Sequence, residues 1–335
     1  MRILGYSHKD SGCGYHRVFL ALGYLTKIQD ITGYVSNYIT DEKLSEGWDI
    51  FLFNRISHFD ADWNKIKILG IKVVMDIDDD WTLPPNHINH AEYKQMAARI
   101  ESNLRNADLV TVTHERLANK VIEFNSNVVV IPNGLPFGEM QYTDDKIPCN
   151  DIRLFWAGGI SHAADIEILR NPMKRISAIK GIQTVIGGYS NANEHSKKVW
   201  DRMVSSFTNG LRIPGAVLTS LPTNEYMNHY SHADIMLLPL EKSEWHSMKS
   251  NLKLLEAACK GIPVICSKVL PYTQHCPPVL WVEKQSDWFN HVNNLVKSKE
   301  MRNDYGVRLN EWAKQFDLRI ISEKRLLCYQ NLLSH

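Results

Sequence analysis

The 335-residue sequence has almost no net charge and no long apolar run. Its 38 Lys and Arg residues nearly balance its 37 Asp and Glu residues, which leaves a formal charge of +1. Such a chain has no overall field that would hold it on nucleic acid or an anionic membrane, although a local basic patch can still form. The apolar runs have the length of short strands, far below the roughly 20 residues that cross a bilayer. The N-terminal stretch MRILGYSHKD turns polar too early for a signal peptide.

Several motifs of enzymes and metal sites are also missing. The six cysteines form no CxxC pair, which argues against a zinc ribbon and predicts reduced thiols in a cytoplasmic protein. GxSxG, HExxH and GxxxxGK[ST] do not occur, so hydrolase, zincin and P-loop functions have no support. The histidine pairs His87/His90 and His229/His232 have no third residue at a spacing typical of metal ligands, and we expect no metal.

Short apolar runs alternate with amphipathic helical patterns along the whole chain. Each run has few internal polar residues, which is typical of a parallel strand covered on both faces. This alternation predicts an α/β protein with doubly wound parallel sheets. The expected strands are Arg2–Tyr6, Asp49–Asn54, Lys72–Met75, Leu109–Val112, Val128–Ile131, Arg153–Ala157, Thr184–Ile186, Ile235–Leu238 and Pro263–Cys266.

The alternation of strands and helices begins at the N-terminus and begins again after residue 150, which predicts two Rossmann-like domains facing across a cleft. After Val128–Ile131 a Pro-Asn-Gly turn leads into a polar stretch without periodicity, which is typical of a linker. We expect an N-terminal domain over 1–148 and a C-terminal domain over 149–315. A terminal helix over 316–335, with an apolar stripe from Ile320 to Leu332, would pack back across the linker. Ligands of open α/β sheets bind beyond the carboxyl ends of the strands.

A glycine-containing loop follows the first strand of each half. The first loop holds Gly12, Gly14 and Tyr15, and the second holds Gly158, Gly159 and His162. Glycine lets the backbone approach a phosphate closely. Arg17 stands where a dinucleotide fingerprint needs its third glycine, so that function is not indicated. A plain strand–helix turn is the alternative for both loops.

Four carboxylates in five residues follow the strand Lys72–Met75, in the sequence Asp76-Ile-Asp-Asp-Asp-Trp81. They would repel one another unless they are solvated, paired with cations or protonated. A general base, recognition of sugar hydroxyls and a divalent ion are the functional interpretations. An exposed turn in which Asp79 or Asp80 caps a helix is the alternative. Asp78 and Asp79 are our candidates for the base that accepts a proton from an acceptor hydroxyl.

A helix with a polar face is predicted between Ser247, as its cap, and Gly261, as its end. Lys249, Lys253 and Glu256 are spaced i, i+4, i+7 and would project from one face. Two ammonium groups at a helix N-terminus suit a diphosphate, and a carboxylate one turn later suits the hydroxyls of a ribose. A solvated face with a Lys253–Glu256 pair is the alternative.

The stretch from Lys249 to Ile265 resembles the nucleotide-sugar-binding helix and following strand of GT-B glycosyltransferases. It is most similar to the large retaining family whose signature ends in Leu-Glu-Ala-x-Ala-x-Gly-x-Pro-Val. The first glycine loop, the turn Ile131–Gly134, the segment Trp156–Gly159 and the segment Ala233–Pro239 agree in order. The acidic cluster and the Gly-Tyr-His-Arg loop resemble a bacterial and bacteriophage subgroup.

The resemblance implies that the domain over 1–148 binds the acceptor and that the domain over 149–315 binds the nucleotide sugar, and it implies a role for each matching residue. Glu256 would bond the ribose of the donor, and Lys249, Ser250 and Lys253 would stabilise the leaving diphosphate, helped by the amides of both glycine loops. Met248 stands where the family has a glutamate that contacts the donor sugar, which leaves the sugar open. The family's Arg–Lys pair is not evident, and His162 would replace it in part. Lysines and amides replace a metal, and no tightly bound cofactor is implied.

The expected function is therefore a hexosyl or pentosyl transfer from a UDP- or GDP-linked sugar to a hydroxyl, with retention. A surface saccharide or glycan is the expected acceptor. A hydroxymethylated base in phage DNA is the alternative, because Lys197, Lys198 and Arg202 surround Trp200, although such a cluster is typical of a solvated helix face. An epimerase or phosphorylase with this architecture and a non-catalytic nucleotide-binding module are rival classes.

Overall fold

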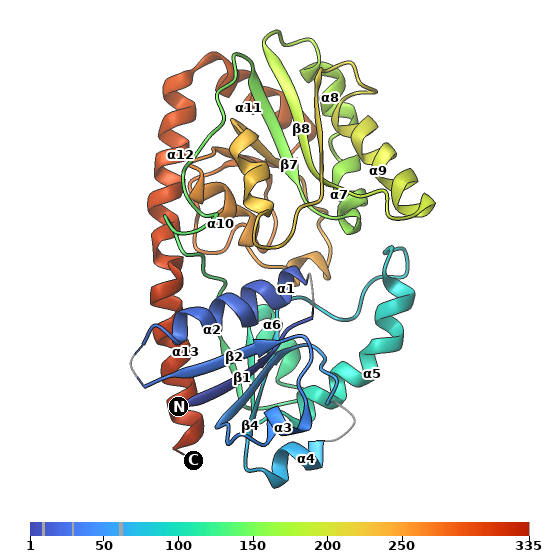
Figure 1. Ribbon diagram of the computed structural model, residues 1–335. Coiled ribbons are helices and arrows are strands. Elements are labelled where there is room, and N and C mark those ends of the chain that lie inside the picture. Colours follow the sequence, from blue (N-terminus) through green and yellow to red (C-terminus); the bar gives the residue numbers. More distant parts are fainter. Residues whose placement is uncertain (9–10, 29, 60–62, 335) are drawn as a thin grey trace. The chain divides into compact units, whose positions relative to one another are not determined.

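The computed structural model describes residues 1–8, 11–28, 30–59 and 63–334. The chain divides into two compact units, and each has its own parallel sheet (Figure 1). The first unit contains Met1–Gly134, Met248–Ser250 and Phe316–His335, and the second contains Leu135–Ser247 and Asn251–Gln315. The expected boundary at residue 148 therefore falls within the second unit, and the C-terminal segment belongs to the first.

In the first unit, six parallel strands lie in the order β2-β1-β3-β4-β5-β6. Strand β3 shows why the strands read as continuous apolar runs: Ile50 and Leu52 face one hydrophobic cluster, and Phe51 and Phe53 face another. Both faces of the sheet are buried. The elements are β1 (Arg2–Tyr6), α1 (Gly12–Gly14), the π-helical turn η1 (Tyr15–Phe19), α2 (Leu20–Leu25), β2 (Thr32–Ser36), α3 (Asp41–Leu44), β3 (Ile50–Asn54), α4 (Trp63–Ile68), β4 (Lys72–Ile77), α5 (His90–Asn106), β5 (Leu109–Val112), α6 (Glu115–Val121), β6 (Val128–Val130) and α13 (Leu318–Leu333).

Helix α13 packs against α2 on one face of this sheet. Its buried side includes Ile321, Arg325 and Tyr329, whereas Ile320 and Leu327 are exposed. The expected apolar stripe is therefore confirmed in part: Ile321 is buried, and Cys328 and Leu332 pack against a hydrophobic cluster of the unit. The stripe omitted Arg325, which a hydrophobic pattern leaves out although it lies inside the unit.

In the second unit, the parallel order is β12-β11-β10-β7-β8-β9. Helices α7, α8, α9 and α11 pack in a connected row, and α10 packs on α12. The elements are β7 (Ile152–Ala157), the 3₁₀ turn η2 (Ile160–His162), α7 (Ala163–Glu167), α8 (Arg170–Ile176), β8 (Ile182–Tyr189), α9 (Glu194–Phe207), β9 (Gly215–Thr219), the 3₁₀ helix η3 (Tyr226–His232), β10 (Ile235–Leu238), the 3₁₀ turn η4 (His246–Met248), α10 (Leu252–Cys259), β11 (Val264–Ser267), β12 (Leu280–Val282), α11 (Gln285–Lys297) and α12 (Lys299–Ala313).

All nine expected strands are present, with bounds that shift by a few residues. The sequence reading missed β2, β9 and β12, which are edge strands of the two sheets. An edge strand pairs on one side only, so β2 (TGYVS) is partly exposed and β9 (GAVLT) is mostly exposed, and both lack the buried apolar run that marks a central strand. None of the helices in the described part of the chain is long and apolar enough to span a membrane.

Candidate functional site

Asp76, the first carboxylate of the acidic cluster, is a structural anchor in the first unit. It is completely buried at the end of β4, where both of its oxygens accept hydrogen bonds from Arg17, each at 2.9 Å. Thr111 donates to the same carboxylate at 2.6 Å. The π-helical turn η1 carries Arg17 inward, and the guanidinium also donates to Asn133 and to the carbonyl of Ile131. Asp76 therefore ties β4 to the first loop and to the turn after β6.

Asp80 is also buried and serves local structure. Its carboxylate accepts hydrogen bonds from the amide and hydroxyl of Thr82, at 2.8 and 2.7 Å, and it pairs with Lys120. Trp81 is buried beside it, with the Lys120 ammonium over its ring. The alternative of an exposed acidic turn is therefore wrong for these positions, because each carboxylate is desolvated and matched by a cation.

Asp78 and Asp79, the two candidate bases, have different partners. Arg55 donates to Asp78 at 2.9 Å, whereas Lys249 lies 3.6 Å from Asp79. Burial by itself would raise the pKa of Asp78, but the Arg55 guanidinium outweighs this effect and lowers that pKa to about 2. Burial raises the pKa of Asp79 above its usual range, although Lys249 opposes the rise. Asp79 is therefore the better proton acceptor of the two.

Arg55, which the sequence analysis did not single out, organises this part of the first unit. Its backbone has a φ of 61°, and the left-handed region costs a non-glycine residue about 1–3 kcal/mol. Its guanidinium contacts Asp78, the hydroxyl of Tyr93 and, at 3.6 Å, the thiol of Cys13. Burial raises the pKa of Cys13, which favours the protonated thiol over the thiolate. A strained residue at the centre of such a contact set is typical of a functional site.

Arg55 also lines a pocket of about 300 Å³ in the first unit. The first glycine loop forms one wall of it through Ser11 and Cys13, and helix α5 forms another through Glu92, Tyr93 and Met96. The lining mixes hydroxyl, carboxylate and aromatic groups, which suits a ligand with hydroxyls on an apolar ring.

The first glycine loop folds into the short helix α1 (Gly12–Gly14). Ser11 caps it by accepting a hydrogen bond from the Gly14 amide at 3.0 Å. A Cβ at Gly14 would lie 2.4 Å from the hydroxyl oxygen of Ser7, so a side chain at this position would displace that hydroxyl. The ring of Tyr15 is buried and stacks on Phe19. Tyr15, an expected donor contact, is therefore packed into the unit.

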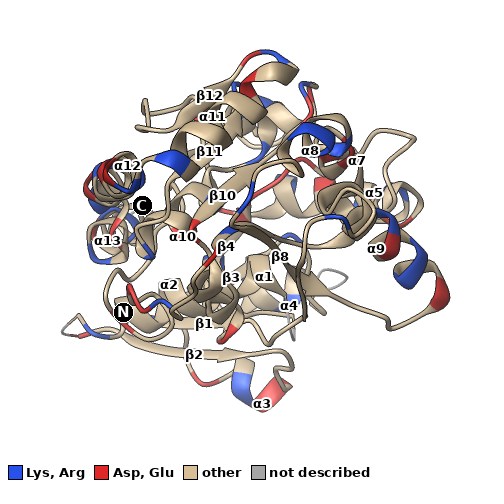
Figure 2. Ribbon diagram, turned by 90° about the horizontal axis from the view of Figure 1, so that it is seen from above, with Lys and Arg blue, Asp and Glu red and all other residues tan. Residues whose placement is uncertain are grey.

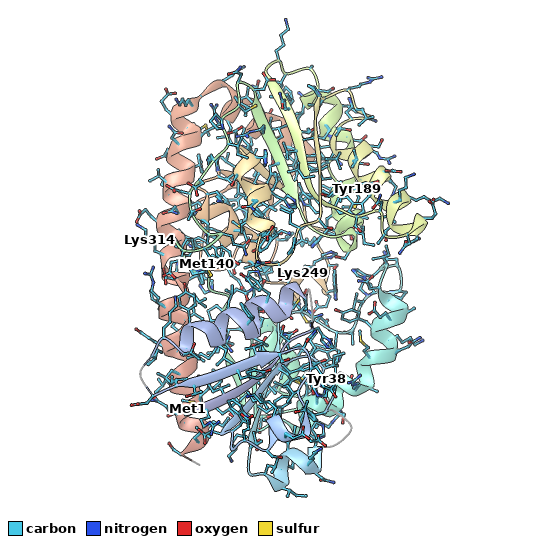
Figure 3. All side chains as sticks on the ribbon, viewed as in Figure 1. Met1, Tyr38, Met140, Tyr189, Lys249 and Lys314 are labelled. Carbon is cyan, nitrogen blue, oxygen red and sulfur yellow. The ribbon has the colours of Figure 1, made fainter. Side chains whose placement is uncertain are left out.

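The segment Met248–Ser250 belongs to the first unit, although its flanking residues belong to the second. The carbonyl of Met248 bonds the His114 ring at 2.8 Å, Lys249 (labelled in Figure 3) pairs with Asp79, and Ser250 accepts from Asn133 at 2.9 Å. The Met248 side chain is buried in the hydrophobic core of this unit. Met248 thus has a packing role at the position where the family that the sequence resembles has a glutamate.

Helix α10 begins at Leu252 and not after Ser247, which corrects the expected cap. Asn251 stands at the N-cap position. The contacts of Met248–Ser250 hold that segment outside the helix, so Lys249 does not share a helix face with Lys253 and Glu256. That expectation was wrong, because a spacing of four and seven residues aligns side chains only where the helix is continuous.

Glu256 is buried at 4% exposure on α10. Its two carboxylate oxygens accept hydrogen bonds from the hydroxyls of Tyr226, at 2.8 Å, and Tyr230, both on η3. Burial, together with the charge of Glu256, raises the pKa of both phenols, so they remain donors. The alternative of a solvated Lys253–Glu256 face is therefore wrong.

Lys253 lies at the second glycine loop. Its ammonium donates to the carbonyl of Ala157 at 2.8 Å and lies 5.7 Å from the centre of the Trp156 ring. Gly188 has a φ of 100°, which side chains rarely allow, and a Cβ there would lie 2.2 Å from the carbonyl oxygen of Gly158. The ends of β7 and β8 can therefore lie side by side only with glycine at position 188. The Gly158 amide donates to Gly187 at 3.2 Å within the sheet, which leaves Gly159 as the candidate for a phosphate contact.

His162 ends the turn η2 and bonds Asp165 on α7 at 2.7 Å. His246 lies 3.3 Å from the other oxygen of the same carboxylate. Asp165, Glu241 and His246 bring possible ligand atoms within 4.8 Å of one another, a spacing that a metal ion could use. Both oxygens of Asp165 already accept hydrogen bonds from protein groups, including the Glu241 amide at 2.9 Å. We therefore assign no metal to this cluster.

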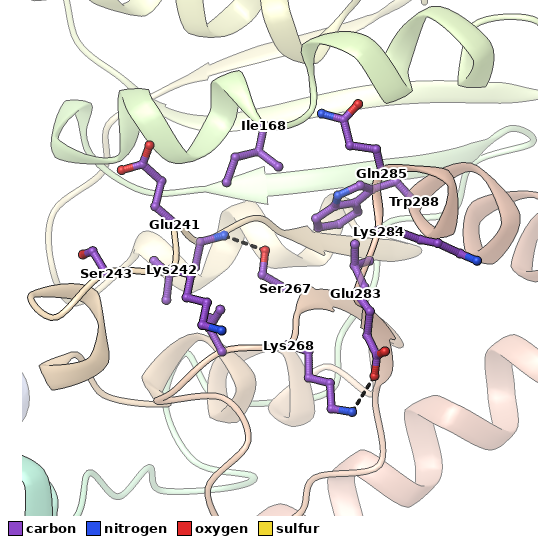
Figure 4. A pocket seen from close by; sticks show the side chains of 13 residues that line it. Ile168, Glu241, Lys242, Ser243, Ser267, Lys268, Glu283, Lys284, Gln285 and Trp288 are labelled. Carbon is purple, nitrogen blue, oxygen red and sulfur yellow. Dashed lines mark hydrogen bonds and ion pairs between the residues drawn. The ribbon is translucent and has the colours of Figure 1, made fainter.

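A larger pocket of about 780 Å³ lies at the carboxyl ends of β10, β11 and β12 (Figure 4). Trp288 forms its apolar part, and Lys242, Lys268 and Lys284 lie around it. Lys268 pairs with Glu283, and the Ser267 hydroxyl accepts from the Leu240 amide at 3.0 Å. Sequence reasoning did not identify this pocket, because its residues come from four separate segments of the chain.

The basic residues Lys197, Lys198 and Arg202 lie on α9, where acidic residues are interspersed with them (Figure 2). Trp200 is buried at 1% exposure and packs edge-on against Trp156. It cannot stack on a nucleobase. The cluster is the solvated helix face that the sequence analysis gave as the typical case.

Comparisons with known proteins agree with this architecture. Residues 151–297 match the family model described as glycosyl transferases group 1. Among curated proteins, none matches the sequence. Sucrose-phosphate synthase from Thermosynechococcus elongatus has a similar structure over 99% of both chains, with a TM-score of 0.71 and 14% identity. Anabaena HepE in complex with UDP-glucose is similar over 100% of both chains, with a TM-score of 0.69 and 12% identity.

A third similar structure is the UDP-forming α,α-trehalose-phosphate synthase from Burkholderia xenovorans. It covers 87% of this chain and 75% of its own, with a TM-score of 0.60 and 12% identity. At these identities the structures establish the fold, and the family model establishes the kinship of the second unit. Residues 151–297 thus match the glycosyl transferases group 1 family, and the two parallel sheets of the chain have the GT-B fold.

Proposed function

We propose that this glycosyltransferase moves a sugar from a nucleotide diphosphate sugar to a hydroxyl of a glycan, with retention of configuration. Uridine is the preferred base of the donor. Two of the similar structures are described with a uridine nucleotide, namely the Anabaena complex with UDP-glucose and the UDP-forming synthase from Burkholderia. Retention and a bacterial or bacteriophage setting rest on the resemblance of the sequence motifs, and a cytoplasmic location rests on the cysteine spacing.

The position of Lys253 is the single observation that carries the proposal. Its ammonium lies at the second glycine loop, so close that a methyl group added at Gly158 would lie 3.2 Å from the nitrogen. Negative charge grows on the diphosphate as the bond to the sugar breaks. A preorganised cation at that place is commonly worth about 3–4 kcal/mol of transition-state stabilisation. Lys253 would therefore act on the leaving group, and no metal is needed for this step.

Glu256 supports recognition of the nucleotide. Two tyrosine hydroxyls hold its carboxylate in one orientation. A carboxylate held in this way can accept hydrogen bonds from the two hydroxyls of a ribose. Ser250 and Lys249 are further candidates for the diphosphate, although in this structure they contact Asn133 and Asp79.

The pocket lined by Arg55 is the proposed acceptor site. Tyr93 offers an aromatic face and Glu92 and Ser11 offer polar groups, which together suit a sugar. Asp79, with its raised pKa, is the proposed base that takes the proton from the acceptor hydroxyl. Asp78 is held ionised by Arg55 and would orient that arginine.

The experiment incubates the protein with UDP- and GDP-linked hexoses and pentoses and measures transfer by mass spectrometry. The acceptors are oligosaccharides and, separately, DNA that contains hydroxymethylated bases. We expect transfer to an oligosaccharide, insensitive to a chelator, and the anomeric configuration of the product by NMR decides retention. Lys253→Met should lower kcat by about a hundredfold or more. The matched control Lys314→Met removes an exposed lysine of the same unit that pairs with Glu311.

The outcomes separate the alternatives. Transfer to DNA alone would replace the glycan acceptor with a modified base. Binding of UDP without turnover for any donor would favour a nucleotide-binding module. Equal rates for Lys253→Met and Lys314→Met would refute the role of Lys253.

A further inference from the structure

Three exposed aromatic rings lie just beyond the carboxyl ends of neighbouring strands in the first unit. Tyr38 (labelled in Figure 3) follows β2, His8 follows β1 and His58 follows β3. These strands are adjacent in the sheet, in the order β2-β1-β3. Open α/β sheets bind their ligands at this edge. The three rings are therefore placed where a ligand of this unit would bind, and none of them belongs to the proposed catalytic groups.

Ring contacts connect Tyr38 to the proposed acceptor pocket. The Tyr38 ring stacks on His58, with 5.7 Å between the ring centres and 16° between the planes. The His58 ring lies 4.9 Å from that of Tyr6, and the Tyr6 ring lies 5.1 Å from that of His8. His8 lines the acceptor pocket together with Arg55. Tyr38, His58, Tyr6 and His8 thus form a continuous aromatic row that leads from the pocket to Tyr38.

Tyr38 is held in position although it is 69% exposed. Its amide donates to the Ser36 hydroxyl at 3.1 Å, and the next residue, Ile39, is buried at 2% exposure. The carbonyl of Ile39 also bonds Nε2 of His58 at 2.9 Å, so the ring that stacks on Tyr38 is anchored to the same turn. A ligand that packs on a ring held in this way loses little affinity to ordering of the protein.

We propose that Tyr38 is a subsite for a further sugar of the acceptor, and that the acceptor is a glycan of two or more sugars. This inference rests on the proposed function, because it extends the proposed acceptor pocket along the same edge of the sheet. The sugar that receives the new bond occupies the pocket, and the following sugars extend along the aromatic row. The C–H bonds on one face of a sugar ring pack on the electron-rich face of tyrosine.

The charges next to Tyr38 favour a glycan over DNA at this place. Helix α3 begins shortly after Tyr38 with Asp41 and Glu42, two carboxylates in its first turn. Lys65 pairs with Asp41, so this cation is already neutralised. A DNA backbone binds through cations that replace its counterions, and carboxylates repel it. A neutral oligosaccharide meets no such repulsion.

The test measures kcat and KM for transfer to gluco-, galacto- and manno-oligosaccharides of one to four sugars. In the wild type, we expect kcat/KM to rise with the length of the acceptor, through a lower KM. Tyr38→Leu removes the aromatic face and should lower the ratio of kcat/KM for the longer acceptors over the monosaccharide by roughly two- to tenfold. Tyr38→Phe keeps the ring and should retain the wild-type ratio.

The matched control is Tyr34→Leu. Tyr34 is a second exposed tyrosine of the same segment, and its ring packs beside Trp48 and not on the aromatic row. This variant should retain the wild-type ratio. Thermal unfolding shows whether each variant keeps the fold. If Tyr38→Leu is unfolded, Tyr38→Asn takes its place, because asparagine is favoured in turns.

Two results would overturn the inference while leaving the proposed function intact. One is a wild-type kcat/KM that is the same for monosaccharides and longer acceptors. The other is the same ratio in the wild type and in Tyr38→Leu. Failure of the wild type to transfer sugar to any oligosaccharide would instead refute the proposed glycan acceptor itself, and this inference with it.

Discussion

Replacing Asp76 with asparagine should destabilise the first unit strongly, although the change is nearly isosteric. Asp76 is completely buried and neutralises Arg17, which is 2% exposed, through two hydrogen bonds of 2.9 Å. A second guanidinium, that of Arg325, lies 3.9 Å from the same carboxylate. Asparagine keeps one acceptor oxygen but removes the charge, so two buried cations lose their counter-ion.

The size of the effect follows from this geometry. Removing one partner of a buried ion pair costs about 3–5 kcal/mol, because the other charge stays desolvated. For a unit of this size, each kcal/mol shifts the melting temperature by roughly 2–4 °C, so we expect a decrease of about 6–20 °C. Urea unfolding followed by tryptophan fluorescence measures the free energy directly.

The control is Glu46→Gln, which removes an exposed carboxylate that pairs with Lys43 in the same unit. An exposed pair is worth about 0–1 kcal/mol, so this variant should unfold close to the wild type. The reasoning would be refuted if Asp76→Asn unfolded within 1 kcal/mol of Glu46→Gln. Such a result would mean that the Arg17 network is solvated or rearranged in solution.

Three further predictions follow from the site. Met248→Glu should destabilise the first unit by several kcal/mol, because the new carboxylate would be buried in a hydrophobic core, and it should bring no gain in transfer rate. Thermal unfolding measures the loss of stability, and a transfer assay measures the rate. Tyr230→Phe should cost about 1–3 kcal/mol in urea unfolding and raise the KM for the donor, since Glu256 loses a buried hydrogen bond. Burial lowers the pKa of His114 below its usual value, so the unfolded chain binds a proton at this histidine more readily than the folded chain does. The free energy of unfolding should therefore fall as the pH drops below about 6.5. In urea unfolding measured against pH, His114→Gln should make that dependence weaker.

The central strands were predictable because each carries an apolar run long enough to be buried on both faces. The interior of α13 was not predictable, because its buried side contains Arg325, whose charge is compensated by a hydrogen bond to the Tyr329 hydroxyl and by the distant carboxylate of Asp76. Periodicity alone cannot locate a buried charge whose partner lies elsewhere in the chain.

The helix before Gly261 shows a different limit. The spacing of Lys249, Lys253 and Glu256 matches a helix, and local propensity gives no reason for that helix to begin as late as Leu252. Tertiary contacts of Met248–Ser250 with His114, Asn133 and Asp79 override that propensity. Residues more than 100 positions apart decide this boundary, so a sequence window cannot find it.

The acidic cluster shows why the residue types were visible but their roles were not. Its four carboxylates are matched by four cations, namely Arg17 with Asp76, Arg55 with Asp78, Lys249 with Asp79 and Lys120 with Asp80. The four acidic residues are close together in the sequence, whereas their four cationic partners come from distant positions. The pairing leaves no excess negative charge among these described residues to attract a divalent ion, and the pKa of Asp78 is lowered whereas that of Asp79 is raised. A base can therefore lie beside a permanently ionised carboxylate, because the position of each cation, and not the spacing of the acids, determines which one can take up a proton.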